Sequence, residues 1–274
     1  MIKRLCKSFS TDSSSGSHFV LTKQNAVATL TFNRPKSLNA LTEDMGIEFE
    51  HIVRSLSQDH SLRALILTGN GKGFSAGGDL NFLRSRTKSS AQHNSEIMRS
   101  FYSSLPFPTI AAINGHAVGA GFCVSLACDF RIASENAKMG LNFVKIGLAP
   151  GMAGSHILPQ LIGIQEANRL ILTGELITAE EARSTGLLLK VVKQSENHKI
   201  LLEEAGGLAK KIISNSPVAV RATLKTLRMK IDDGLERALQ READSQAHSY
   251  SSPDYIEGLD ALVEKRNPDF KDFK

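Results

Sequence analysis

The chain has 274 residues, which is enough for one large domain or for one domain with a smaller appendage. Its hydrophobic content of 41% and its charged content of 22% are ordinary for a globular protein. No apolar run approaches the ~20 residues that a membrane-spanning helix needs, so no membrane span is expected. The net charge of +5 is modest, and Lys3, Arg4 and Lys7 contribute much of it, so the composition gives no reason to expect a nucleic-acid partner.

The chain has three cysteines, Cys6, Cys123 and Cys128. This odd and sparse count argues against a disulfide framework and favours a reducing compartment. No group of His, Cys, Asp and Glu residues has the spacing of metal ligands, so no metal is expected. Gly115, Gly119 and Gly121 do not form G-x-G-x-x-G, so no dinucleotide cofactor is expected either.

Residues 1–11 interleave basic, apolar and hydroxyl side chains, and no acidic residue precedes Asp12. This composition is typical of a mitochondrial transit segment, and the polar residues that follow are interpreted as a linker ending at residue 17. The sequence therefore predicts a location in the mitochondrial matrix. The alternative is a basic tail that directs nothing.

From residue 19 the pattern predicts an α/β fold. Paired strands are expected at residues 19–21 and 26–32, and a helix is expected from Thr42 to about Ser57. The apolar face of this helix is expected to carry Ile47, Val53 and Leu56, with Phe49 and Ile52 beside them. Further strands are expected at 64–68, 109–113, 130–133, around Met139 and at 187–192, with helices at 91–105, 155–161, 165–172 and 179–184.

After residue 196 only helices are expected, at 196–214, 217–230, 234–249 and 253–265. A helical tail after a β–α body indicates either a second compact unit or an oligomerisation element. The predicted division is therefore a segment 1–17, a core 18–195 and a helical region 196–274.

Two glycine-rich corners, at residues 73–79 and 119–121, follow two of the predicted strands. Glycine allows a sharp turn and lets a ligand approach main-chain amides. In the second corner these amides open an apolar helix, whose positive dipole end suits an anion or a developing oxyanion. The alternative explanation for the glycines is tight packing of a helix on a strand.

Five runs resemble the enoyl-CoA hydratase/isomerase (crotonase) superfamily in both order and spacing. They are NRPKSLNAL at 33–41, GFSAGGDL at 73–80, AINGHAVGAGFCVSLACD at 112–129, IGLAPG at 146–151, and LTG at 172–174 with Ala179, Ala182, Gly186 and Leu187. The resemblance extends from about residue 19 to the C-terminus. It implies an α/β fold of repeated β-β-α units with a C-terminal helical trimerisation region, assembled as a homotrimer or a dimer of trimers.

The resemblance also implies a site for an acyl-CoA thioester, with coenzyme A entering as part of the substrate. Two main-chain amides would form an oxyanion hole that stabilises a thioester enolate, and the matching positions are Gly78 and Ala120. The segments that surround coenzyme A in the family match Lys36, Leu38, Ala40, Ala76, Asp79 and Leu80. For the lysine, a solvated surface side chain is the alternative.

Three acidic positions of the family are substituted in this chain. The two glutamates that handle water in hydratases are matched by Cys123 and Phe143, and the aspartate of some isomerases is matched by Gly151. Cys123 is either a thiol activated near a helix N-terminus or a buried, inert side chain. His156 is the remaining candidate acid or base, and a surface histidine at a helix start is its alternative.

Residues 73–77 also fit the G-x-S-x-G pattern of serine hydrolases, with Ser75 as nucleophile and Asp129 and His156 following in the order such enzymes use. A nucleophile elbow places the serine directly after the strand, whereas here four residues separate the predicted strand from the motif. A serine hydrolase is therefore only a remote alternative.

The basic run Lys210, Lys211, Arg221, Lys225, Arg228 and Lys230 has no aromatic residues among its charges. We therefore expect a solvated helix face here rather than an RNA site.

Together these features predict a protein of the hydratase/isomerase class that acts on a CoA thioester in fatty-acid or amino-acid acyl-CoA metabolism. The alternative is a catalytically impaired acyl-CoA-binding or interaction protein, because the family's acids at positions 123 and 143 are absent.

Overall fold

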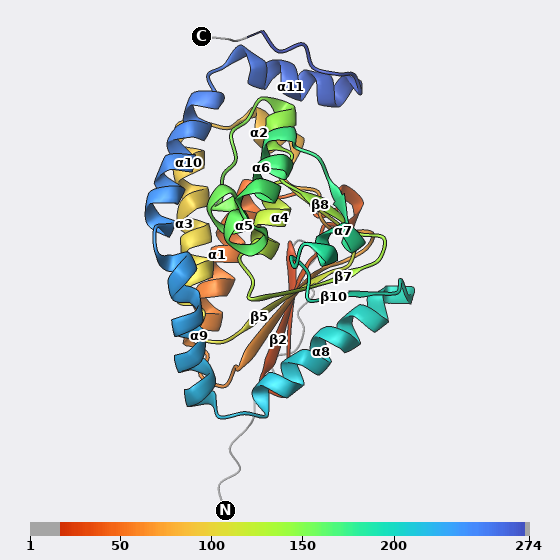
Figure 1. Ribbon diagram of the computed structural model, residues 1–274, viewed down its shortest axis with the longest axis vertical. Coiled ribbons are helices and arrows are strands. Elements are labelled where there is room, and N and C mark those ends of the chain that lie inside the picture. Colours follow the sequence, from red (N-terminus) through yellow and green to blue (C-terminus); the bar gives the residue numbers. More distant parts are fainter. Residues whose placement is uncertain (1–16, 272–274) are drawn as a thin grey trace, which may run out of the picture.

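The computed structural model describes residues 17–271, so the predicted transit segment lies outside the described residues except for its last position. A six-stranded sheet in the order β1-β2-β3-β5-β7-β10 forms the centre of the molecule (Figure 1). Strands β1 and β2 are antiparallel, and every later neighbour pair in this sheet is parallel. The strands are β1 (Phe19–Gln24), β2 (Val27–Phe32), β3 (Ala64–Gly69), β5 (Thr109–Ile113), β7 (Phe130–Ser134) and β10 (Lys190–Val192).

A second sheet of four short strands has the order β4-β6-β8-β9. Its strands are β4 (Gly73–Ser75), β6 (His116–Val118), β8 (Lys138–Gly140) and β9 (Ile177–Thr178). Strands β3, β5 and β7 of the large sheet lead in turn into β4, β6 and β8 of the small one, and helices follow. The chain therefore repeats the β-β-α unit that the resemblance implies.

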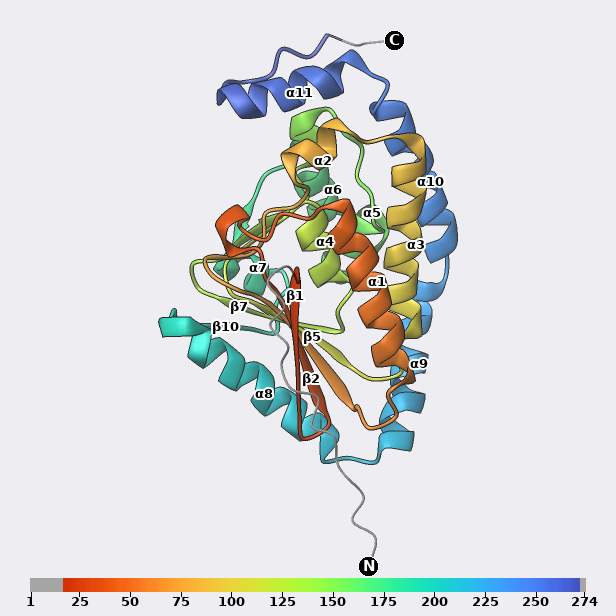
Figure 2. The same ribbon diagram turned by 180° about the vertical axis from the view of Figure 1, so that it is seen from behind.

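Helices cover both faces of the large sheet. Helix α8 crosses one face, while α1, α3 and α10 lie side by side on the other side of the molecule (Figures 1 and 2). The helices are α1 (Glu43–Gln58), α2 (Leu80–Arg84), α3 (Lys88–Ser104), α4 (Ala120–Leu126), α5 (Gly154–Ile162), α6 (Ile164–Thr173), α7 (Ala179–Ser184), α8 (Lys199–Ile213), α9 (Pro217–Asp232), α10 (Leu235–Ser249) and α11 (Pro253–Glu264), with 3-10 turns at Pro35–Ser37, Phe143–Ile146 and Glu196–His198.

Helix α1 begins where the sequence predicts, but its core face differs. Thr42 caps the helix, since its side chain accepts a hydrogen bond from the Met45 amide at 3.3 Å. The buried stripe is Met45, Phe49, Val53 and Leu56, with the spacing of one helix face. Ile47 is 42% exposed, so its predicted place in the core was wrong: it lies two residues from Met45 and points away from the stripe.

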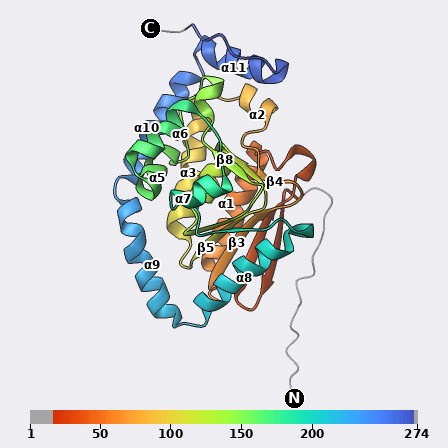
Figure 3. The ribbon, with the colours of Figure 1, turned by 45° about the vertical axis from the view of Figure 1, so that its right-hand side comes forward.

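The C-terminal helices do not form a compact unit of their own. Leu201, Ala205 and Ala209 of α8 are buried in one cluster with Ala64 and Ile110 of the large sheet. Helix α10 packs along α3, and α11 contacts the turn at 143–146. Helix α9 lies along the edge of the molecule (Figure 3). The alternative of a second compact unit is therefore corrected, whereas an oligomerisation role for this region stays a prediction.

Other differences concern short elements. Strand β10 is shorter than the predicted 187–192, because Leu187 and Leu188 lie in the turn before it. The predicted helix 196–214 is broken, since Asn197 and His198 have positive φ angles and α8 starts only at Lys199. Strands β4 and β6 were not predicted because three residues are too few to show a period. Within residues 17–271, no helix is long and apolar enough to cross a membrane.

Candidate active site

The two glycine corners lie next to each other in space. Strands β4 and β6 are parallel neighbours, and each ends in one corner, at Gly77 and Gly78 and at Gly119 and Ala120. A Cβ atom on Gly77 would lie 2.9 Å from the Val118 carbonyl oxygen and 3.8 Å from the Ala120 nitrogen. Glycine is required at this position by the close approach and by its φ of 92°.

The amides of Gly78 and Ala120, one from each corner, border the cavity described below and have no acceptor among the described residues; the neighbouring Gly121 amide has none either. Ala120 is the first residue of α4, so its N–H lies at the positive end of the helix dipole. At the other end of α4, the buried guanidinium of Arg131 donates to the Leu126 carbonyl at 3.3 Å and the Cys128 carbonyl at 2.5 Å. These bonds satisfy carbonyl groups at the C-terminal end of α4 and hold the helix in place.

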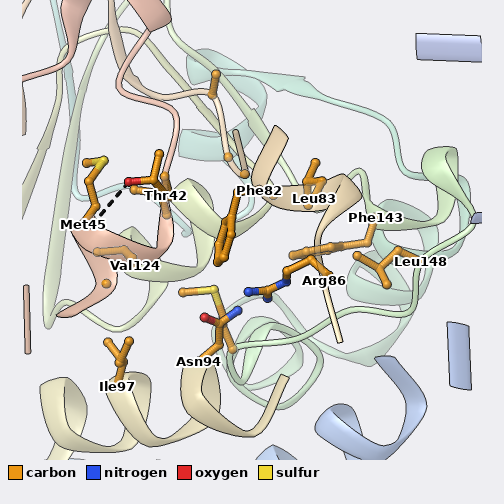
Figure 4. Close-up of a pocket in the computed structure, with 18 of the residues that line it drawn as sticks. Thr42, Met45, Phe82, Leu83, Arg86, Asn94, Ile97, Val124, Phe143 and Leu148 are labelled. Carbon is orange, nitrogen blue, oxygen red and sulfur yellow. Dashed lines mark hydrogen bonds between the residues drawn. The ribbon is translucent and has the colours of Figure 1, made fainter. Parts of the chain in front are cut away.

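Both corners border a cavity of about 140 Å³. Its wall is mainly apolar, and it includes Phe82, Leu83, Ile97, Val124, Phe143 and Leu148 (Figure 4). Among the described lining residues there is no carboxylate, imidazole, ammonium or thiol. The cavity therefore offers two unpaired amides to a ligand inside an apolar surround, where such donors interact strongly with negative charge.

The residues matched to coenzyme A lie on one side of the first corner. Leu38 and Ala76 are exposed and adjacent, since the Ala76 amide donates to the Leu38 carbonyl at 2.9 Å. Lys36 is exposed on the 3-10 turn, and Ala40 is buried below it. This placement keeps Lys36, Leu38 and Ala76 available to a ligand at the surface.

The remaining two coenzyme A candidates have structural roles. Asp79 forms an ion pair with Arg34 at 3.3 Å and caps α2 through the Asn81 amide at 3.1 Å. Leu80 is the first residue of α2 and packs against the core. Their positions therefore fix the loop that carries Gly78.

Cys123 is fully buried and does not line the cavity. Its thiol donates to the Gly151 carbonyl oxygen at 3.3 Å. Burial, and secondly the nearby Glu242 carboxylate, raise the pKa of this thiol well above its usual value. These observations favour the inert interpretation of Cys123 over the activated one.

Of the two other positions matched to family acids, Gly151 contacts Cys123 through its carbonyl. Phe143 lines the cavity and makes its wall apolar. Gly151 packs against α10, and a Cβ atom there would lie 2.4 Å from Nε2 of Gln246. The Gln246 amide donates to the Ala149 carbonyl at 3.1 Å, so a neutral side chain from α10 fills the space beside Gly151.

His156 lies away from the cavity lining. Its Nε2 is 2.8 Å from the Ile231 carbonyl oxygen and 3.0 Å from the Gln160 amide nitrogen. Both contacts are structural, so this placement favours the helix-start interpretation over a role as acid or base at the cavity.

The serine-hydrolase triad is not assembled. The buried Ser75 hydroxyl donates to the Asn39 carbonyl at 2.8 Å. The Asp129 carboxylate accepts from Thr109 and Arg228 instead of from His156. Without a histidine at the hydroxyl, the nucleophile lacks its base.

Asp129 also corrects the interpretation of the basic run. Arg228 binds this carboxylate through two hydrogen bonds, of 2.9 and 2.7 Å, and its side chain is only 11% exposed. Arg228 therefore joins α9 to the core and is not part of a solvated face.

Among residues 17–271, no three His, Cys, Asp or Glu side chains are grouped so that they could hold a metal ion.

Sequence reasoning missed several polar groups of the cavity, among them Arg86, Asn94, Gln246 and Tyr250. They come from the segment after α2, from α3, from α10 and from the residue that follows α10, and they are up to 164 residues apart. No local pattern joins them. A local sign of the cavity's charge was Arg86, which follows the short helix α2 by two residues; this helix also carries Phe82.

A fold of alternating long and short parallel strands, with free amides at two glycine corners beside an apolar cavity, defines the crotonase class of proteins. A sequence model of the family described as Enoyl-CoA hydratase/isomerase matches residues 22–273. The chain therefore belongs to the enoyl-CoA hydratase/isomerase family.

Similar proteins agree with this assignment. The "Crotonyl-CoA hydratase" of Syntrophomonas wolfei is 35% identical over 257 residues, which cover 92% of this chain and 97% of that protein. The "Probable enoyl-CoA hydratase, mitochondrial" of Dictyostelium discoideum is 33% identical over 277 residues, covering 98% of each chain. The crystal structure of an enoyl-CoA hydratase from Mycobacterium avium subsp. paratuberculosis superposes with a TM-score of 0.85 at 30% identity, covering 93% of this chain and 99% of that one.

Proposed function

We propose that the protein binds an acyl-CoA thioester in the cavity and polarises its carbonyl with the N–H groups of Gly78 and Ala120. The observation that carries this proposal is the pair of unpaired amides at neighbouring corners of one apolar cavity. Donors fixed by the backbone need no reorganisation when charge develops on the carbonyl oxygen. The species they favour is a thioester enolate.

Of the reactions of this family, water addition is the one for which this chain has the fewest suitable side chains. A positioned acid or base contributes about 10²–10⁴-fold to such a reaction. Cys123 is a buried thiol with a raised pKa and Phe143 has no ionisable group, so neither replaces a glutamate. We therefore propose an enzyme of the hydratase/isomerase class in which hydration is slow.

A second candidate function is acyl-CoA binding without turnover. It is favoured by one observation, the absence of carboxylate, imidazole and thiol groups from the described lining of the cavity. Both candidates require thioester binding, and only the first requires a chemical step.

The test combines binding with turnover. Calorimetry with a saturated acyl-CoA measures binding, and a panel of enoyl-, dienoyl- and β-substituted acyl-CoAs followed by mass spectrometry measures chemistry. Binding with turnover of one panel member supports the enzyme, whereas binding without turnover at any pH supports the second candidate. If no thioester binds, both proposals are wrong.

Glutamates placed at positions 123 and 143 test whether the pocket lacks only these acids for water addition. We expect Cys123→Glu combined with Phe143→Glu to increase hydration of a short enoyl-CoA while CoA binding is kept. The matched control is Cys123→Gln with Phe143→Gln, which has the same size but no charge. Equal hydration by both double variants, with binding intact, would show that the pocket is not built for water addition.

We further propose a homotrimer or a dimer of trimers, located in the mitochondrial matrix. The assembly is supported by exposed apolar side chains on α9 and by family membership. The location is supported by the composition of residues 1–11 and by the name of the Dictyostelium relative. A fluorescent fusion of the full chain, compared with one starting at residue 18, tests the location.

A further inference from the structure

Arg86 brings a positive charge into the apolar cavity. The residue follows α2 and is half-buried, and Figure 4 shows its guanidinium group reaching inward between Phe82 and Phe143. Asn94 of α3 points toward the same group (Figure 4). The cavity that holds the two free amides therefore also holds a cation.

The partners of Arg86 within the described residues are all neutral. Its carbon Cζ lies 4.5 Å from the centre of the Phe82 ring and 5.7 Å from that of Tyr250. Its Nε donates to the Tyr250 hydroxyl at 3.2 Å. The Asn94 amide fits its surroundings when its oxygen faces Arg86. In this orientation the oxygen accepts from Nη1 of Arg86 at 3.1 Å and also from Nη2.

These contacts leave the guanidinium group without a counter-charge. No carboxylate among residues 17–271 pairs with Arg86, whereas Arg84, two positions earlier, pairs with Asp260 at 2.6 Å on the outside of the molecule. A charge withdrawn from water into an apolar wall costs free energy unless an opposite charge compensates. Three of its five N–H groups have partners, so one on each terminal nitrogen is free to donate.

We propose that Arg86 and Asn94 receive a carboxylate at the far end of the acyl group, so that the preferred ligands are CoA thioesters of dicarboxylic acids. The inference rests on the proposed function, because the thioester end must lie at Gly78 and Ala120. Either of the two free N–H groups can donate a charge-assisted hydrogen bond to a carboxylate oxygen, and the apolar wall suits the methylene groups between the two ends. Tyr250 positions Arg86 and is itself fixed, since its hydroxyl donates to Oε1 of Gln246 at 3.2 Å.

The test measures binding by calorimetry with saturated thioesters of equal carbon number. We expect the full chain to bind glutaryl-CoA and adipyl-CoA at least about tenfold more tightly than pentanoyl-CoA and hexanoyl-CoA, since a hydrogen bond between two charged groups is stronger than one between neutral groups. Arg86→Gln should abolish this preference while keeping the affinity for the monocarboxylic thioesters. Arg84→Gln, on the same segment but outside the cavity, should keep the preference.

A second variant covers the case in which Arg86→Gln does not fold. Asn94→Asp supplies a carboxylate from the chain itself, so we expect a higher melting temperature together with loss of the preference for dicarboxylic thioesters. If Arg86 has only a structural role, the wild-type protein should bind dicarboxylic and monocarboxylic thioesters with equal affinity. Equal binding of both ligand classes by the wild type overturns this inference alone, whereas no binding of any thioester overturns the proposed function.

Discussion

At the scale of single residues, Cys123 and Cys128 are two free thiols inside the core. Both side chains are buried, and Cys128 contacts the Val124 carbonyl of α4 at 3.6 Å. The sequence predicts that both residues lie inside an apolar helix, but α4 ends at Leu126, so this is wrong for Cys128. The sequence also left open whether Cys123 is activated. That question depends on a neighbour 28 positions away, the Gly151 carbonyl, which no local pattern reveals.

The raised thiol pKa values predict a loss of stability in alkali. Burial raises the pKa of Cys128 to about 12, whereas in the unfolded chain the thiol ionises near its usual value of 9.0. Between these values the unfolded state binds fewer protons, so the free energy of unfolding should fall by about 1.4 kcal/mol per pH unit for each such thiol. Urea titrations from pH 8 to 10.5 under reducing conditions measure this slope.

The control for this prediction is Cys128→Ala, which removes one of the two thiols but leaves every other alkaline group in place. Its stability should decline less steeply with pH than that of the wild type. Parallel curves for the two proteins would show that the thiol does not remain protonated in the folded state.

At the scale of elements, helix α1 was predictable from its helical period and strand β3 from its continuous apolar run, which is buried at every position. Strands β4 and β6, which carry the corners, are only three residues long and show neither signal. The corners themselves were still found, because glycine has a specific backbone role. The polar lining of the cavity was not, because it depends on how α3 and α10 pack together.

The ion pair of Arg228 with Asp129 is one of the contacts that join helix α9 to the core, beside the buried Leu224 side chain. The Arg228 guanidinium binds Asp129, whose side chain is 13% exposed, and also donates to the Leu105 carbonyl at 2.8 Å. Arg228→Ala would leave this carboxylate without its partner and should lower the free energy of unfolding by about 3–5 kcal/mol. Urea unfolding measures the change.

Lys225→Ala provides the matched control on the exposed side of α9, and it should change stability by less than about 0.5 kcal/mol. A loss of similar size in the two variants would mean that the ion pair contributes no more than surface charge. Arg228→Lys keeps the charge without the two-pronged contact, so an intermediate loss is expected.

At the scale of the whole molecule, α9 presents apolar side chains that the described chain leaves uncovered. Val218 is 77% exposed, Leu227 is 70% exposed and Met229 is 62% exposed. Exposed apolar groups gathered on one helix indicate an interface. Since the family resemblance implies a trimer, we expect sedimentation equilibrium to give about three or six times the chain mass of 29.7 kDa.

Leu227→Asp should shift this mass toward that of a monomer, because it places a charge at an exposed apolar position of the helix proposed as the interface. Ile47→Asp on α1 adds the same charge at another exposed apolar position and should leave the mass unchanged. A wild-type protein that sediments as a monomer at micromolar concentration would contradict the proposed assembly.

The central claim is that the amides of Gly78 and Ala120 polarise a thioester carbonyl, and one variant tests it without knowledge of the reaction. Ala120 is the first residue of α4, a position that accepts proline, so Ala120→Pro removes the N–H donor and keeps the helix. Ala120→Gly keeps the donor and serves as the control. The measurement is the isotope-edited infrared band of a bound acyl-CoA carbonyl.

We predict that the carbonyl band lies at lower frequency on the wild type and on Ala120→Gly than in solution, because two hydrogen bonds weaken the carbonyl bond. On Ala120→Pro the band should move back toward its solution value while the thioester stays bound. An unshifted band on the wild type, or an equal shift on Ala120→Pro, would contradict the claim that these amides form an oxyanion hole.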